Sequence, residues 1–150
     1  MSRRTVLTII LAIAVAVASP TTASARPADF FDRANGICAS ELPNIVKLLG
    51  RVSKAPNRAQ AVVLLDQLGT LFRRLSVRLS ALQPLPEYKS DWSKFTSALR
   101  KSSDGMTRAA HDLRSSKTPK STNYDTARTQ LDLSTLLADD LGLYSCGSGA

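Results

Sequence analysis

Two cysteines are the residues with the clearest capacity for chemistry in this sequence of 150 residues. Cys38 and Cys146 lie near opposite ends of the chain. A metal site would need more ligands than the sequence offers around them, so we predict no bound metal. In an exported protein the two cysteines predict one disulfide bond, which would join the two ends of the fold.

The other residues that could catalyse a reaction are few and isolated. His111 is the only histidine, and helical periodicity places it opposite the apolar side of its segment, toward solvent. Asp139 and Asp140 are adjacent, so on a helix their carboxylates point about 100° apart and do not form a metal site by themselves. The common hydrolase, nucleotide-binding and zinc-protease motifs are absent from the sequence. We therefore predict no catalytic residue, no cofactor and no enzymatic activity.

Basic residues form the one surface pattern with contrast. Lys94, Lys101 and Arg108 recur every seven residues along a predicted helix, on the side away from its apolar residues. Such a row can bind a polyanion by releasing counterions, and an anionic cell-envelope polymer or acidic lipid headgroups would suit it. Aromatic residues that could stack on bases are missing from that side, so we expect no specific nucleic-acid binding. The alternative is a basic face that only keeps the protein soluble.

The first 25 residues predict a cleaved export signal. A short start with two arginines precedes a long apolar run, and the A-S-A sequence at 23–25 fits a cleavage site. We therefore expect residues 1–25 to be removed and the mature chain to begin at Arg26. The alternative is a retained membrane anchor, although the strongly apolar part stops at Ala18, short of the roughly 20 residues that a spanning helix needs.

Export would place the protein in the cell envelope or outside the cell. The start of the chain resembles the twin-arginine motif, but the long apolar run favours the general secretion route. Loss of Arg3 and Arg4 lowers the basic residues from 20 to 18 against 12 acidic ones, so the mature chain carries a net charge of +6. At this length we expect one domain, over residues 26–146, followed by a disordered tail at 147–150.

Apolar residues at steps of three and four predict two helices in the first half of the chain. The first spans Ala28 to Val52, with a kink expected at Pro43 because proline removes a backbone donor. The second begins with a capping box at Asn57. Val63 and Val77 point away from its apolar side, so a second neighbour is expected to cover them. That apolar side consists of Ala61, Leu65, Leu68, Phe72, Leu75, Leu79 and Leu82.

The second half predicts two more helices. Helix three follows the prolines at 84 and 86, and Asp104-Gly105 could divide it in two. Its apolar side consists of Trp92, Phe95, Leu99, Met106, Ala109 and Leu113. After a loop at 117–120, helix four is predicted to run from Ser121 to Cys146. Its apolar face consists of Tyr124, Ala127, Leu131, Leu133, Leu137, Ala138, Leu141 and Tyr144.

Four amphipathic helices with short connections predict an all-α fold, an antiparallel up-down-up-down four-helix bundle. Helix four then runs antiparallel to helix one, so the end of helix four lies beside the start of helix one. Cys38 and Cys146 can meet there, and one disulfide closes the bundle. The entropy of so long a closed loop predicts a stabilisation on the order of 4 to 5 kcal/mol.

Three short motifs are spread over nearly all of the mature chain. They are Phe30-Phe31-x-x-Ala34-x-x-Ile37-Cys38, Leu82-x-Pro84-Leu85-Pro86 and Ala138-x-x-Leu141-Gly142-Leu143-x-x-Cys146. Their arrangement resembles the small exported helical proteins of actinobacteria, most of which are uncharacterised. The resemblance implies a disulfide-closed helical domain outside the membrane, and it carries over no catalytic residue and no substrate.

A non-enzymatic binding or interaction module of the cell envelope or the extracellular space is the function that these features favour. A carrier of a small apolar ligand is the alternative, because Ser102 and Gly105 interrupt the apolar side of helix three around Met106, and bundles build pockets between their helices. An enzyme and an inhibitor of another secreted protein are the remaining hypotheses.

Overall fold

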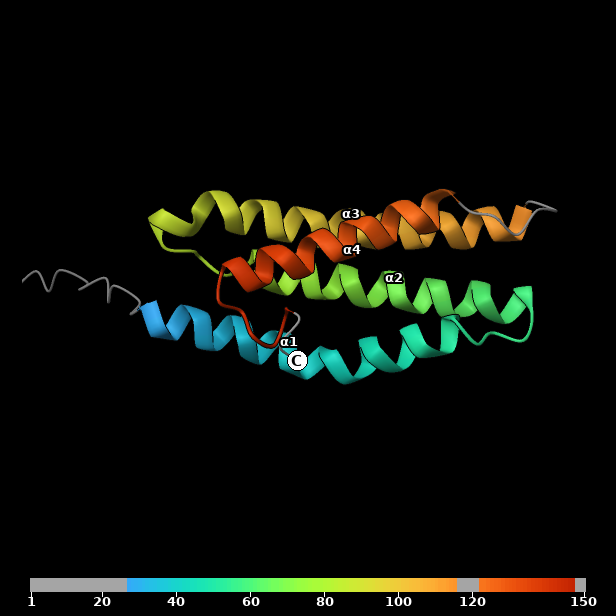
Figure 1. Cartoon of the computed structure of the whole chain (residues 1–150), viewed down its shortest axis with the longest axis horizontal. Helices are drawn as coiled ribbons and strands as arrows, with labels where there is room; N and C mark the ends of the chain where they lie inside the picture. The colour runs from blue at the N-terminus through green and yellow to red at the C-terminus, as the bar shows by residue number, and fades with distance from the viewer. Residues whose placement is uncertain (1–26, 116–121, 148–150) are drawn as a thin grey trace, which may run out of the picture.

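Four long helices make up the computed structural model, which describes residues 27–115 and 122–147. Helix α1 spans Pro27–Val52, α2 spans Arg58–Ser80, α3 spans Lys89–Ser115 and α4 spans Thr122–Asp140, with a short 3-10 helix η1 at Pro86–Tyr88. Figure 1 shows the long helices running in alternating directions, which confirms the predicted up-down-up-down bundle. The predicted export signal at 1–25, the loop at 117–120 and residues 148–150 lie outside the described residues.

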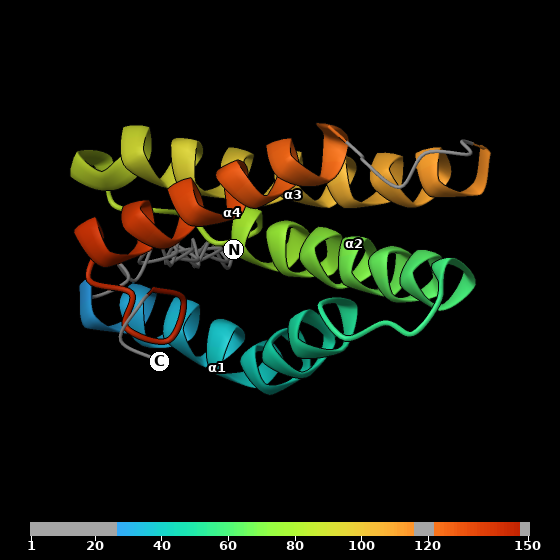
Figure 2. The same ribbon diagram turned by 45° about the vertical axis from the view of Figure 1, so that its right-hand side comes forward.

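Helix α1 is bent and begins in an aromatic cluster. Pro43 lies inside this helix, and Figure 2 shows the bend near its middle, as expected where proline lacks a backbone donor. Near its start, the ring of Phe30 packs edge-on against Trp92 at 4.8 Å between centroids. Phe31 packs in the same way against Tyr88 at 5.2 Å. These contacts hold the start of α1 against η1 and the start of α3.

Helix α2 is the predicted amphipathic helix with the predicted cap. The side chain of Asn57 accepts a hydrogen bond from the backbone N–H of Gln60 at 2.9 Å, which satisfies one of the free donors of the first turn. The apolar side from Leu65 to Leu82 is buried. The expectation that a neighbour covers Val63 and Val77 is wrong, because both side chains are more than half exposed.

Helices α3 and α4 cross at very short range. A Cβ atom on Gly105 would lie only 2.7 Å from the Cβ of Ala127, and the hydroxyl of Ser102 donates to the carbonyl oxygen of Ala127 at 3.0 Å. Helix α3 is continuous through Asp104-Gly105, so the possible division there is wrong. The predicted packing defect around Met106 is wrong as well, since Met106 and Ser102 are fully buried.

Helix α4 ends earlier than predicted, at Asp140 rather than Cys146. Gly142 has a φ of 72°, which glycine adopts without strain. The N–H of Leu143 donates to the carbonyl oxygen of Ala138 at 2.8 Å, so the chain leaves the helix in a Schellman turn. The turn carries Leu143 into the core and leaves Tyr144 exposed, contrary to the predicted apolar face. Leu133 of that face is also exposed.

The helices pack in sequence, α1 on α2, α2 on α3 and α3 on α4. Within the described residues, no Cα atom of α1 lies within 8 Å of a Cα atom of α4. The fourth side of the bundle is instead joined by the C-terminal turn and its disulfide. This side is where the structure leaves apolar surface open.

Candidate functional site

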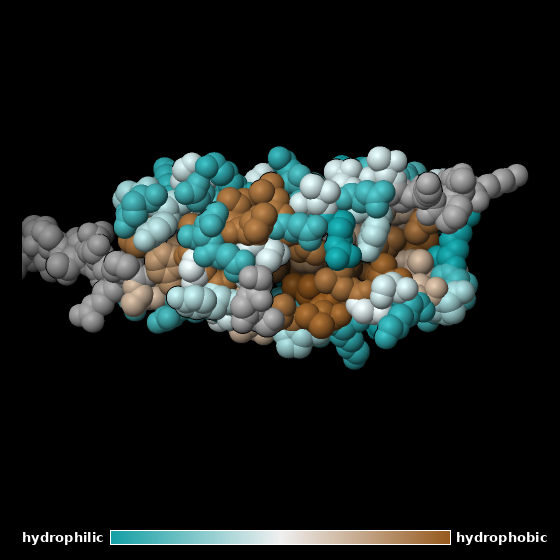
Figure 3. All heavy atoms as spheres, viewed as in Figure 1, coloured by the Kyte–Doolittle hydropathy of each residue, from teal (hydrophilic) through white to brown (hydrophobic). Residues whose placement is uncertain are grey.

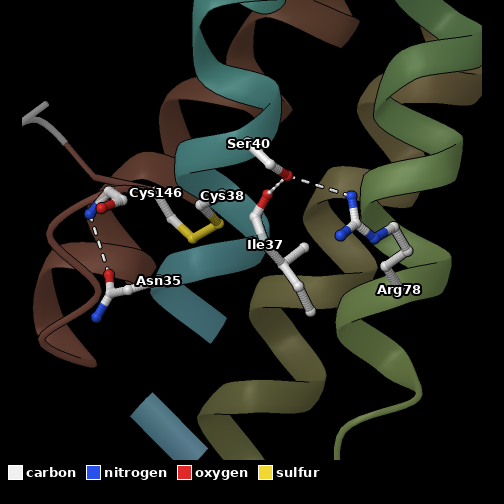
Figure 4. Close-up of a disulfide and its surroundings, with 7 residues drawn as sticks. Asn35, Ile37, Cys38, Ser40, Arg78 and Cys146 are labelled. Atoms are coloured by element: carbon white, nitrogen blue, oxygen red, sulfur yellow. Dashed lines mark hydrogen bonds between the residues drawn. A yellow bond between two sulfur atoms is a disulfide. The ribbon is translucent and has the colours of Figure 1, made fainter. Parts of the chain in front are cut away.

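The disulfide occurs where the bundle topology places it. Cys38 on α1 and Cys146 in the turn after α4 are bonded, with 5.2 Å between their Cα atoms, which confirms the predicted pair. Figure 4 shows the bond beside a second link, in which the backbone N–H of Ser145 donates to Oδ1 of Asn35 at 3.1 Å. These two links fix the C-terminal turn on α1.

A buried carboxylate fixes the other side of α1. Glu41 is only 6% exposed, and its two oxygens pair with Arg74 at 3.0 Å and with Arg78 at 3.1 Å. Arg78 also donates to the hydroxyl of Ser40, as Figure 4 shows. Helix α1 is therefore held to α2 by ion pairs and to the C-terminal turn by a covalent bond.

The predicted basic strip lies on the surface of α3. Lys94, Lys101 and Arg108 are all exposed. Lys94 pairs with Asp91 at 2.7 Å, whereas Lys101 and Arg108 make no ion pair within the described part of the chain. The strip is thus a row of solvent-exposed cations and not a pocket with ordered polar contacts.

The other candidate ionisable residues lie on the surface. His111 is exposed, as predicted, and its Nδ1 lies 4.0 Å from Oδ1 of the neighbouring Asp112. Asp139 and Asp140 are exposed on the last turn of α4. Among residues 27–115 and 122–147 there is no group of three or more His, Cys, Asp or Glu side chains that could hold a metal ion.

An apolar groove opens between α1 and α4 and is the candidate functional site. Leu42, Val46 and Leu49 of α1 form one wall, and Leu131, Ser134 and Thr135 of α4 form the other. Phe72 of α2 and Phe95 of α3 lie at its floor, and the disulfide closes one end. The cavity measures about 170 Å³ and opens to solvent. Figure 3 shows hydrophobic residues along the opening between α4 and α1.

Two hydroxyls on the α4 wall of the groove are already hydrogen-bonded. The hydroxyls of Ser134 and Thr135 both donate to the carbonyl oxygen of Leu131 on their own helix, at 2.7 and 3.1 Å. The backbone N–H of Ser145 is bonded to Asn35. No ionisable side chain lines the groove among the described residues, and the two cysteines are bonded to each other. The groove therefore offers a nonpolar surface and no group poised to transfer a proton.

This groove was not predicted from the sequence. The sequence feature that indicates the groove is the apolar pair Ile45-Val46. In the structure Ile45 is buried, whereas Val46 is 60% exposed. Two adjacent apolar residues widen the apolar side of a helix beyond what one neighbour covers. The sequence pattern does not indicate whether α4 or solvent covers the additional apolar residue.

Comparisons with protein-family models, with curated proteins and with solved structures gave no match to this chain. The resemblance to small exported helical proteins of actinobacteria therefore stays a prediction. No helix within the described ranges is both long enough and apolar enough to span a bilayer.

Proposed function

We propose that this protein is an exported, non-enzymatic binding module that takes an apolar ligand into the groove between α1 and α4. The observation that carries the proposal is the open side of the bundle, where Val46 and the leucines of α1 face α4 across a gap instead of packing on it. Apolar surface left open in this way is stabilised when a ligand removes it from water, by about 25 cal/mol for each Å² covered.

The lining favours binding over catalysis. Each hydroxyl in the groove walls either donates a hydrogen bond to a helix carbonyl or lies beside the disulfide. No side chain there can act as an acid, a base or a metal ligand. Orientation of a ligand would therefore come from shape and apolar contact. This is the chemistry of the carrier hypothesis, located between α1 and α4 rather than around Met106.

The size of the groove limits the ligand. Its 170 Å³ is close to that of a cavity of about 150 Å³ that holds benzene, and is below the roughly 300 Å³ at which drug-sized pockets begin. A short alkyl chain, one ring or a single apolar side chain fits these dimensions. A larger ligand would have to extend along the open edge.

Export is part of the proposal and is supported by two features. The start of the sequence has the pattern of a cleaved signal, and the domain contains a disulfide, which persists in oxidising compartments.

The basic strip of Lys94, Lys101 and Arg108 supports a second candidate function, binding of an anionic envelope polymer. Lys101 and Arg108 are exposed without an ion pair in the part of the chain that the structure describes.

The proposal is tested by filling the groove. In Thr135→Trp the indole occupies the space between α4 and α1, so 1-octanol should bind at least about tenfold more weakly than to the parent chain. Displacing two methylenes of the probe is enough for this loss, since each buried methylene contributes about 0.8 kcal/mol. Binding is measured by titration with methyl NMR as the readout.

The matched control is Thr129→Trp. Thr129 lies on the same helix and makes the same type of bond, from its hydroxyl to the carbonyl four residues earlier, but it is exposed. This variant should bind octanol like the parent chain. No binding of octanol to the parent chain, or equal binding by both tryptophan variants, would rule out the groove as the site.

A further inference from the structure

We infer that the ligand of the groove is a single-chain anionic amphiphile, with its alkyl chain between α1 and α4 and its carboxylate on Lys47, Arg51 and Lys54. This inference rests on the proposed function and names the ligand class for the same site. It is carried by a second hollow that adjoins the groove and has the opposite chemical character.

The two hollows share a wall. Val46 lines the apolar groove on one side and, on the other, a shallow hollow of about 330 Å³ between the end of α1 and the start of α2. Lys47, Arg51 and Lys54 line this second hollow. A chain lying in the groove therefore reaches a cationic region by passing over one valine.

The three cations are arranged to act together. Lys47 and Arg51 are four residues apart on α1, so they are neighbours on one face of the helix, and Lys54 follows in the loop. All three are exposed. Helix C-termini favour a cation near Arg51, but this effect does not account for Lys47, one turn earlier, or for Lys54, beyond the helix end.

These cations also differ from four arginines of α2 and α3. Arg73, Arg74, Arg78 and Arg114 each pair with a carboxylate of a neighbouring helix. Within residues 27–115 and 122–147, Lys47, Arg51 and Lys54 have no carboxylate partner. Positive charge is thus left over beside the apolar groove and is complementary to an anionic headgroup.

The ligand that satisfies both hollows has an alkyl end and a charged end. The groove has room for a short length of alkyl chain, and the cations at the far side of Val46 leave the headgroup in contact with water. A free alkyl carboxylate meets these conditions with a single chain. We commit to this source, and attachment to an anionic membrane is the competing outcome of the test.

The test compares octanoate with 1-octanol, which differ only in the headgroup. The variant combines Lys47→Gln, Arg51→Gln and Lys54→Gln. It should bind octanoate about fivefold to tenfold more weakly than the parent chain at low ionic strength, and it should bind octanol unchanged. Unchanged octanol binding shows that the variant is folded and that its groove is intact.

A variant with the same change of charge serves as the control. Arg33→Gln, Lys89→Gln and Arg100→Gln together remove three exposed cations that line neither hollow, and should leave octanoate binding within about twofold of the parent value. An equal loss in both triple variants would assign the effect to net charge and overturn the inference.

The remaining outcomes separate this inference from the proposed function. In one outcome the parent chain binds octanol while the triple variant of Lys47, Arg51 and Lys54 binds octanoate as tightly as the parent chain does. This result would overturn the carboxylate site but would leave the groove as the site of the alkyl chain. Failure of both probes to bind would overturn both. Binding to vesicles of anionic phospholipid, without binding of octanoate, would overturn the free amphiphile as the source of the headgroup.

Discussion

Glu41 and Leu42 are adjacent on α1 but meet different surroundings. Glu41 points into α2 and is buried by Arg74 and Arg78, whereas Leu42 lines the open groove. A hydropathy pattern assigns the inner position to the apolar member of such a pair, which here is Leu42. A buried carboxylate is recognisable only when its partners are known, and Arg74 and Arg78 come from a different helix. The burial of Glu41 was therefore not predictable from α1 alone.

The ion pairs of Glu41 should matter to stability. Glu41→Gln keeps the shape of the side chain and removes the charge that two arginines contact, so we expect the free energy of unfolding to fall by about 1 to 3 kcal/mol. Asp132→Asn is the control, because the pair of Asp132 with Arg128 is exposed and spans 3.9 Å. The control should change stability by less than about 0.5 kcal/mol in urea denaturation. Equal effects of the two variants would mean that Glu41 contributes no more than a surface charge.

At the level of elements, the positions of helices α1, α2 and α3 followed from the sequence, but the roles of two glycines did not. Pro43 bends α1 and Asn57 caps α2, as predicted. A missing backbone donor and a capping side chain act locally, so the sequence alone indicates them. Gly105 was interpreted as a helix breaker, whereas it permits α3 and α4 to approach. Gly142 ends α4, and its role was hidden by the assumption that the helix reaches Cys146. A glycine in a helical pattern has both meanings, and only the neighbouring helix decides between them.

The close approach at Gly105 can be tested against a glycine in open space. Gly105→Ala places a methyl group 2.7 Å from the Cβ and 3.1 Å from the Cα of Ala127, so α3 and α4 must separate. We expect a loss of about 1 to 3 kcal/mol in unfolding free energy, despite the better helix propensity of alanine. In Gly36→Ala the new Cβ meets nothing within 4 Å, so stability should be unchanged or should rise by up to about 1 kcal/mol. A gain in both variants would show that the crossing is loose enough to admit a methyl group.

For the whole molecule, the up-down-up-down topology and the disulfide followed from helix order and the positions of two cysteines. The open side of the bundle was not predicted, because the predicted topology assumed that the fourth helix packs on the first. The C-terminal turn, with Cys146 and Ser145 linked to α1, spans that side instead. The candidate site thus arises from a gap between two helices, and a pattern read along one helix contains no information about such a gap.

An apolar chain bound in this gap must contact the side chains on both of its walls. Nuclear Overhauser effects are recorded between 1-octanol and the methyl groups of the parent protein. Contacts from the probe to Leu42, Val46 and Leu131 are the predicted result, since these side chains form the two walls of the groove. Val63 and Val77 provide the background, because they lie elsewhere on the bundle and are exposed to a degree similar to Val46. Contacts to these two valines alone, or none to the groove walls, would show that octanol does not bind between α1 and α4.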